Sequence, residues 1–399
     1  MKIGIVTTWY ERGAAYVSRI YMDLLHKSGH EVFIYSRAGQ NPPKGIEKWN
    51  EDYVTRDNTY RNFQINKHKF FCWIKKNNLN VILFNEQQDF RIVAETKRRF
   101  PDIKLAAYVD YYTERTRKWF VLYDFLICNT KRHMQAMEGH PQKYYMQWGT
   151  DTKLYRPSKE QHNILTFFHS VGMSTRKGTD ILIEAFIEGE CFKKSKLIIH
   201  TQRPIEDVCN YKREFLEQNN IQIIEKTVTA PGLYYMGDVY VYPTRLDGLG
   251  LTMYEALSSG LPVITSDFPP MNEAVNNECG KLIKIKDYYC RQDAYYYPLV
   301  VCDKEDLIHK MQWYIDNPEQ IIIQKEAARR YAVEHYEITD RYKELSRIFE
   351  TAKIRKLDTA IYKDVMWYYK KEINTIHQYT DNRTWIYNLK CKIIKMMRR

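Results

Sequence analysis

Two carboxylates flank a glycine-rich turn in the second half of the chain, with Asp247 before Gly250 and Glu255 after it. A buried strand at Val239–Tyr242 leads into this turn, and a helix starts near Leu251. Such a turn presents free backbone N–H groups and the positive end of a helix dipole, which suits a phosphate. Carboxylates beside the phosphates can hold the hydroxyls of a ribose or a sugar. The pattern therefore predicts a nucleotide-sugar site.

A second turn carries positive charge. A strand at Phe167–Val171 precedes Arg176, Lys177 and Gly178, and a helix follows at Thr179–Ile187. Fixed cations at such a place stabilise negative charge that develops on a departing diphosphate. The alternative is an ordinary solvated loop. Its position between a buried strand and a helix favours the functional interpretation.

The N-terminal half contributes a third turn. The sequence predicts a strand at 2–8, a turn at Gly13 and an amphipathic helix that ends at about Ser28. Further on, Asp110 follows a predicted strand at Leu105–Tyr108. Two interpretations of Asp110 stay open: a contact to the donor sugar, or the N-cap of the helix that follows.

Several of these motifs together resemble the family 4 retaining glycosyltransferases, in matching order over roughly residues 1–350. The donor-site signature of that family, E-G-F-G-L-x-x-x-E-A, is similar to Asp247-Gly248-Leu249-Gly250-Leu251-Thr252-Met253-Tyr254-Glu255-Ala256, with Asp in place of the first Glu. The segment Trp148–Pro157 is similar to the N-G-V-D-x-x-x-F-x-P hinge between the two domains of the family.

Two further matches depart from the family pattern. Lys177-Gly178 matches the end of the G-R-L-x-x-x-K-G loop, but Met173 occupies the usual arginine position, so Arg176 is expected to supply that charge. Asp110 matches the acid of a His-Asp pair, whereas Val109 stands where His is common. The role of that histidine is therefore not carried over.

The resemblance implies a reaction and a set of site residues. It implies a retaining transfer of a sugar from a nucleoside diphosphate sugar to a hydroxyl of a glycan or lipid-linked acceptor, in surface polysaccharide assembly. The donor is a substrate, and no permanently bound cofactor is expected. No metal is expected either, since no D-x-D pair follows a strand. The implied contacts are Glu255 to the ribose, Asp247 and Asp110 to the donor sugar, Arg176 and Lys177 to the diphosphate, and the backbone at Gly13, Gly250, Leu251 and Thr252 to the phosphates.

Length and pattern agree with the fold that the resemblance implies. A chain of 399 residues suits two domains, and strands alternate with helices throughout. The expected class is α/β of GT-B type, with two doubly wound Rossmann-like domains facing a central cleft and a basic helical C-terminal tail. The expected bounds are 1–157 for the acceptor-side domain, 158–340 for the nucleotide-sugar domain, and 341–399 for helices that return to the first domain and the tail.

Half of the formal net charge of +12 lies in residues 356–399, where ten basic residues face four acidic ones among many aromatic side chains. This composition fits an anionic membrane surface, a nucleic-acid backbone, or a helical appendage packed on the N-terminal domain. The fifteen residues Trp385–Arg399 are the expected membrane contact. Functional alternatives are a glycosyltransferase that modifies nucleic acid, or a non-catalytic binding protein on the same fold.

The remaining features bound the compartment and exclude one enzyme class. Eight cysteines are scattered without a C-x-x-C pair, which indicates free thiols. No signal-peptide pattern and no transmembrane-length apolar run is recognised, so we expect a cytoplasmic protein, peripheral on the inner face of the membrane. A nicotinamide-dependent dehydrogenase is disfavoured because no G-x-G-x-x-G follows the first strand.

Overall fold

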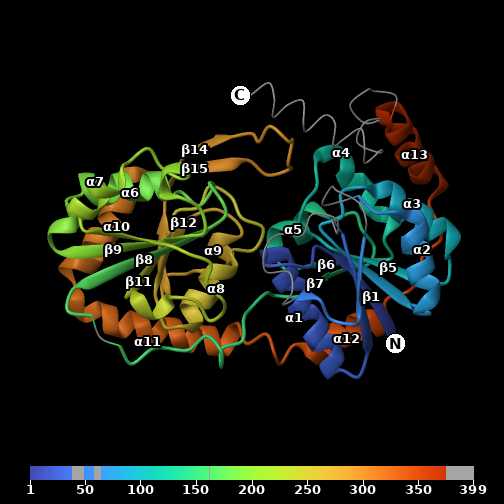
Figure 1. The fold of residues 1–399 in the computed structure, drawn as a ribbon, viewed down its shortest axis with the longest axis horizontal. Helices are drawn as coiled ribbons and strands as arrows, with labels where there is room; N and C mark the ends of the chain where they lie inside the picture. Colours follow the sequence, from blue (N-terminus) through green and yellow to red (C-terminus); the bar gives the residue numbers. More distant parts are fainter. Residues whose placement is uncertain (38–48, 58–63, 161, 374–399) are drawn as a thin grey trace. The chain divides into compact units, whose positions relative to one another are not determined.

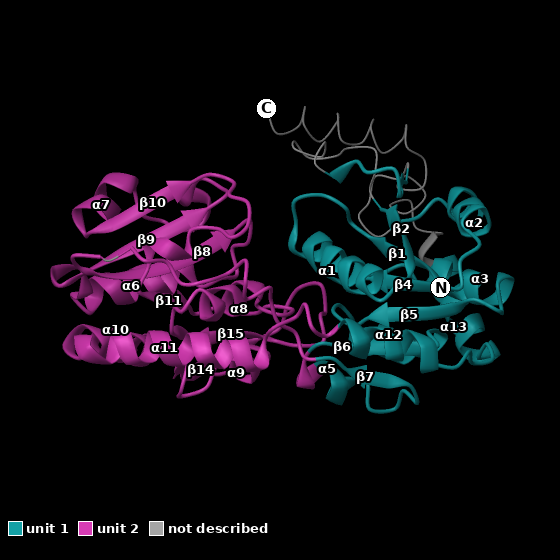
Figure 2. Cartoon of the chain, turned by 90° about the horizontal axis from the view of Figure 1, so that it is seen from below, with its two compact units in different colours: residues 1–129, 133–146, 342–399 teal, residues 130–132, 147–341 magenta. Residues whose placement is uncertain are grey.

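The chain forms two compact units in the computed structural model (Figures 1 and 2). Unit 1 combines both ends of the chain, and unit 2 is the middle. Unit 1 comprises residues 1–129, 133–146 and 342–399, and unit 2 comprises 130–132 and 147–341. The structure describes residues 1–37, 49–57, 64–160 and 162–373. Within this part of the chain no helix is long and apolar enough to cross a membrane.

Unit 1 is built on a seven-stranded parallel sheet in the order β3-β2-β1-β4-β5-β6-β7. The strands are β1 Lys2–Thr7, β2 Glu31–Ser36, β3 Val54–Arg56, β4 Val81–Asn85, β5 Lys104–Tyr108, β6 Phe125–Cys128 and β7 Lys143–Tyr145. The helices between them are α1 Gly13–Lys27, α2 Lys67–Lys76, α3 Phe90–Arg99, α4 Glu114–Arg117 and α5 Lys131–Ala136. The strand order turns outward from β1 in both directions, which is the doubly wound pattern.

Unit 2 repeats this arrangement with six parallel strands in the order β10-β9-β8-β11-β12-β13. The strands are β8 Leu165–Gly172, β9 Ser195–Thr201, β10 Ile221–Glu225, β11 Val239–Tyr242, β12 Val263–Ser266 and β13 Gly280–Ile283. The helices are α6 Thr179–Glu188, α7 Arg213–Gln218, α8 Leu251–Ser258, α9 Met271–Ala274, α10 Lys304–Asp316 and α11 Pro318–His335. The predicted class of two doubly wound α/β domains is confirmed.

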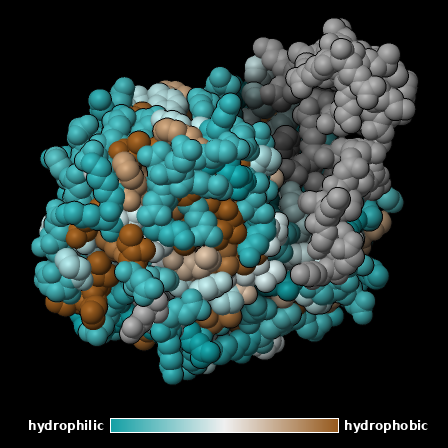
Figure 3. All heavy atoms as spheres, turned by 60° about the vertical axis from the view of Figure 1, so that its left-hand side comes forward, coloured by the Kyte–Doolittle hydropathy of each residue, from teal (hydrophilic) through white to brown (hydrophobic). Residues whose placement is uncertain are grey.

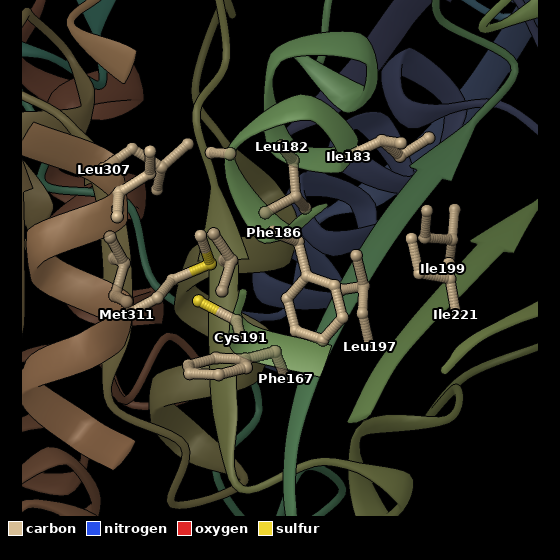
Figure 4. Packing of buried hydrophobic residues seen from close by; sticks show 14 of the residues in the cluster. Phe167, Leu182, Ile183, Phe186, Cys191, Leu197, Ile199, Ile221, Leu307 and Met311 are labelled. Atoms are coloured by element: carbon tan, nitrogen blue, oxygen red, sulfur yellow. The ribbon is translucent and has the colours of Figure 1, made fainter. Parts of the chain in front are cut away.

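A continuous apolar core lies on one face of the unit 2 sheet (Figure 4). Phe167 of β8, Phe186 of α6 and Leu197 of β9 pack there with Met311 of α10, all fully buried. Val239 and Val241 of β11 belong to the same cluster. Because side chains alternate along a strand, Tyr240 and Tyr242 lie on the opposite face of β11. This alternation is what frees one face of β11 for polar groups.

The C-terminal helices α12 Tyr342–Thr351 and α13 Thr359–Ile373 pack on unit 1. The His30 ring hydrogen-bonds the Ser346 hydroxyl at 2.8 Å, and the Trp119 indole donates to Asp364 at 2.7 Å. The described part of the basic segment 356–399 therefore forms a helix packed on unit 1, which is one of the three alternatives for this segment. The expected membrane contact at Trp385–Arg399 lies outside the described residues.

The tyrosine-rich segment 287–298 begins as a strand. Strand β14 Ile285–Tyr289 pairs antiparallel with β15 Leu299–Cys302. Tyr288 and Tyr289 are about half exposed on this hairpin, and Phe268 packs edge-on against Tyr288.

The surface in Figure 3 is mainly hydrophilic, with apolar side chains in small groups.

Candidate nucleotide-sugar site

Two helices of unit 2 begin at a glycine in the left-handed conformation. Gly178 (φ 73°) precedes α6 and Gly250 (φ 75°) precedes α8, and neither helix start has a side-chain cap. Strands β8 and β11 that lead into these turns are paired neighbours. A Cβ on Gly178 would lie 2.0 Å from the Pro243 carbonyl oxygen, so only glycine fits there. The first N–H groups of two helices therefore lie at the carboxyl edge of one sheet.

A cation and a carboxylate meet between these two turns. The Lys177 ammonium donates to Asp247 and to the hydroxyl of Tyr242, which also donates to Asp247. The Lys177 nitrogen lies 4.9 Å from the centre of the Tyr242 ring. Burial by itself would raise the pKa of Asp247, but Lys177, Tyr242 and the charge of Arg176 outweigh burial and hold the pKa below its usual value. Asp247 is therefore kept ionised.

Arg176 belongs to the same turn but is held by its backbone. Its carbonyl accepts the Arg245 amide at 2.8 Å and the Thr244 hydroxyl at 3.2 Å. Among the described residues, its guanidinium forms no ion pair, although its charge lowers the pKa of Asp247. The structure thus brings Arg176, Lys177 and Asp247 together and leaves the Arg176 guanidinium available for an anion.

Glu255 lies in the second turn of α8 and is bound by two tyrosines. The Tyr155 hydroxyl donates to one carboxylate oxygen at 3.1 Å, and the Tyr234 hydroxyl donates to the other at 2.5 Å. Burial raises the pKa of Glu255, while the two hydroxyls act in the opposite direction. The carboxylate is fixed in orientation and can accept further hydrogen bonds on the remaining lone pairs.

Tyr240 and Tyr242 of β11 lie between Asp247 and Glu255. Their rings stack with centroids 5.7 Å apart, and the hydroxyls of both lie next to Thr252 at the start of α8. Sequence reasoning did not assign these tyrosines or Tyr234 to the site. The alternation Val-Tyr-Val-Tyr in β11 was the available signal, because a central parallel strand usually has apolar residues on both faces.

A cavity of about 330 Å³ adjoins this site within unit 2. Tyr234, Tyr235, Pro157 and Leu261 give it an apolar lining, and helix α11 contributes charged side chains. Tyr234 faces both regions, since it lines this cavity and donates its hydroxyl to Glu255.

Two of the predicted site residues, Gly13 and Asp110, belong to unit 1. Gly13 is the first residue of α1. Burial alone would lower the pKa of Arg12 beside it, but the charge of Glu86, the Tyr10 hydroxyl and the more weakly acting charge of Asp110 together outweigh burial and raise the pKa. Asp110 is not a helix N-cap: Thr113 caps α4 in a reciprocal capping box with Thr116. Of its two interpretations, the cap is wrong.

The other predicted residues lie together in unit 2: Arg176, Lys177, Asp247, Gly250, Leu251, Thr252 and Glu255. No group of three or more His, Cys, Asp or Glu within the described ranges could hold a metal ion. The seven cysteines in those ranges are free thiols.

Residues 162–294 match the family described as glycosyl transferases group 1. The chain is 24% identical over 191 residues to an uncharacterized glycosyltransferase of Sulfolobus islandicus rod-shaped virus 1, covering 44% of this chain and 55% of that protein. It is 26% identical over 129 residues to the lipopolysaccharide core biosynthesis mannosyltransferase LpsB of Rhizobium meliloti, and this alignment covers 30% of this chain and 37% of that protein. The aligned part thus spans about half or less of each of these relatives.

Solved structures extend the similarity to most of the chain. Anabaena HepE in complex with UDP-glucose superimposes with a TM-score of 0.67 at 14% identity, covering 88% of this chain and 100% of that one. The fold is GT-B, with two Rossmann-like units and a helical C-terminal region.

Proposed function

We propose that this protein is a retaining, metal-independent glycosyltransferase that moves a sugar from a nucleoside diphosphate sugar to a hydroxyl of a glycan or lipid-linked acceptor. The observation that carries the proposal is the Lys177–Asp247 pair between two helix starts that lack side-chain caps. An anion with two phosphates finds both cationic and N–H donors there. The match of residues 162–294 to the glycosyl transferases group 1 supports it.

Each side chain has a distinct part in the proposed transfer. Lys177 and Arg176 stabilise the negative charge that grows on the diphosphate as the glycosidic bond breaks, and the amides at Gly250–Thr252 add N–H donors. Asp247 turns toward the donor sugar once the phosphates engage Lys177. Glu255 accepts hydrogen bonds from the ribose.

Retention is proposed from the resemblance of the donor-site motif to the family 4 retaining glycosyltransferases. A covalent intermediate is not part of the proposal, because neither acid of this site is set up as a nucleophile. In the proposed donor complex Asp247 stays bound by the Tyr242 hydroxyl and faces hydroxyls of the sugar, and Glu255 stays bound by two tyrosine hydroxyls. A covalent retaining mechanism needs a free carboxylate facing the anomeric carbon. Front-side attack by the acceptor, assisted by the departing phosphate, fits the arrangement better.

The donor and acceptor classes rest on the similar proteins. UDP sugars are the first donors to test, because the HepE structure contains UDP-glucose. A role in surface polysaccharide assembly, with an acceptor at an anionic membrane, is proposed from the similarity to LpsB and the basic composition of residues 356–399.

The test is binding and transfer with and without Lys177. UDP, GDP, ADP and CMP and their sugars are screened by thermal shift, where a ligand at 100 times its dissociation constant stabilises by about 2.7 kcal/mol. With the donor found, Lys177→Met should reduce kcat by roughly 10²–10³-fold, as removal of one donor to a developing anion does elsewhere. Glu255→Gln should weaken nucleotide binding.

The matched control is Lys194→Met. Lys194 is exposed, and its ion pair with Asp316 is long, at 3.8 Å. It should leave turnover and binding unchanged. No thermal shift with any nucleotide would refute the donor site, and a non-catalytic protein would bind nucleotide without transfer.

A further inference from the structure

Glu255 is approached by hydroxyls from two places far apart in the chain. Tyr155 comes from the segment before β8, 100 residues away, and Tyr234 from a 3₁₀ turn before β11, 21 residues away. Each hydroxyl donates to a different oxygen of the carboxylate. The two rings contact each other edge-on with centroids 6.2 Å apart.

The position of Tyr155 is set by its backbone. Asp151 caps the turn by accepting the amides of Lys153 and Leu154 at 2.9 and 3.1 Å. Arg329 of α11 then donates to the carbonyls of Tyr155, Thr152 and Ser258 at 3.0, 2.9 and 2.7 Å. Because Ser258 is the last residue of α8, Arg329 fastens the Tyr155 turn to the helix that carries Glu255.

Tyr234 is fixed by packing. Only 5% of it is exposed, and its ring contacts Phe168 and Tyr240 with centroids 5.7 and 5.8 Å away. Neighbouring Tyr235, in contrast, is 43% exposed and lines the same cavity. Because the buried Tyr234 ring is packed on two sides, the position of its hydroxyl is fixed.

The chemical result is a carboxylate with a fixed orientation that can only accept hydrogen bonds. Each oxygen already accepts one tyrosine hydroxyl and keeps one lone-pair direction for a ligand. A ligand that places hydroxyl donors there gains charge-assisted hydrogen bonds, and one that lacks them leaves the carboxylate underbonded.

We infer that Tyr155 and Tyr234 are positioning residues that make Glu255 select for ribose hydroxyls, so that the site prefers ribonucleotides to deoxyribonucleotides. The inference rests on the proposed nucleotide site. The sugar preference of the nucleotide is thereby assigned to two tyrosines that act through Glu255.

The experiment compares affinities of UDP, GDP and ADP with those of their 2′-deoxy and 3′-deoxy counterparts by calorimetry. The wild-type chain should bind the ribonucleotide about tenfold or more tightly than at least one deoxy form, as expected for a hydrogen bond to a charged group. Tyr155→Phe and Tyr234→Phe should each reduce this ratio several-fold, mainly by weakening the ribonucleotide. Tyr235→Phe is the matched control and should keep the wild-type ratio.

The ratio of ribonucleotide to deoxyribonucleotide affinity separates a positioning role from general loss of structure. A site that is merely loosened should lose affinity for both nucleotides by the same factor. An unchanged ratio in Tyr155→Phe and Tyr234→Phe overturns the inference and leaves the nucleotide site standing. A wild-type chain that binds no nucleoside diphosphate overturns the proposed function and the inference with it. A reduced ratio in Tyr235→Phe as well also counts against the two tyrosines.

Discussion

Asp247 owes its ionised state to neighbouring side chains. Its folded-state pKa is lowered, so its contribution to stability is present above the unfolded value and is lost as pH falls through the folded value. Lys177→Met removes the largest of the lowering influences and leaves the opposing effect of burial, so the pKa of Asp247 should rise. Acid destabilisation should then begin at a higher pH than in the wild-type chain.

Melting temperatures measured between about pH 3 and 6 check this shift, with the ordinary Asp pKa of 3.8 as the reference. The Lys194→Met variant should follow the wild-type curve. Superimposable curves for Lys177→Met and wild type would mean that Lys177 does not govern the protonation of Asp247.

At the same scale, the sequence predicted the charged residues and missed the tyrosines. Lys177, Asp247 and Glu255 could be found because glycines at fixed offsets mark them. Tyr234 has no glycine at a fixed offset to mark it, and for Tyr242 the signal was the alternation of Val and Tyr in β11. Only the register of β11 tells which face its tyrosines occupy. The contact of Arg176 with a ligand stays a prediction.

At the scale of elements, the α6 start depends on the absence of a side chain at Gly178. Gly178→Ala would strain a positive φ and also press a methyl group against the Pro243 carbonyl, whereas Gly172→Ala adds strain at φ 60° with its nearest neighbour 3.6 Å away. The strain of a positive φ costs about 1–2 kcal/mol in each variant. Gly178→Ala should therefore cost clearly more, because the backbone at Pro243 must move.

Denaturant unfolding of both variants measures the difference in free energy of unfolding, and nucleotide titration reports on the turn itself. Equal losses in the two variants would show that the close approach to Pro243 is unimportant.

The elements that carry the candidate site in unit 2 could be predicted from periodicity. Strand β11 has its predicted bounds, and β8, α6 and α8 start within two residues of expectation. The hairpin β14–β15 was missed because one strand carries consecutive exposed tyrosines in place of an alternating pattern, and its partner lies ten residues later. One of the two interpretations of Asp110 placed the start of α4 there, but the Thr113–Thr116 capping box decides its start.

At the scale of the molecule, unit 1 needs both ends of the chain. Phe349 of α12 is fully buried and contacts Phe125 of β6 edge-on with centroids 5.3 Å apart. Phe349→Ala should destabilise unit 1 by about 3–5 kcal/mol, as large-to-small changes in a core do. Unit 2 has its own sheet and core, so its nucleotide binding should persist.

Hydrogen exchange resolved by peptide is the measurement, with faster exchange expected in β5 and β6 and unchanged nucleotide protection at the starts of α6 and α8. Phe215→Ala is the control, because Phe215 is 40% exposed on α7 of unit 2. Faster exchange confined to unit 2 in Phe349→Ala would contradict the division of the chain.

The contact between Lys177 and Asp247 also bears on how a ligand first arrives. Before any diphosphate binds, these opposite charges largely cancel one another, so the approaching anion meets only a weak attractive field from them. The first attraction on a diphosphate then comes from the Arg176 guanidinium and the starts of α6 and α8, and added salt should screen it. Lys177 exchanges a carboxylate partner for a phosphate at the moment of capture, and the carboxylate that it releases becomes available for the sugar.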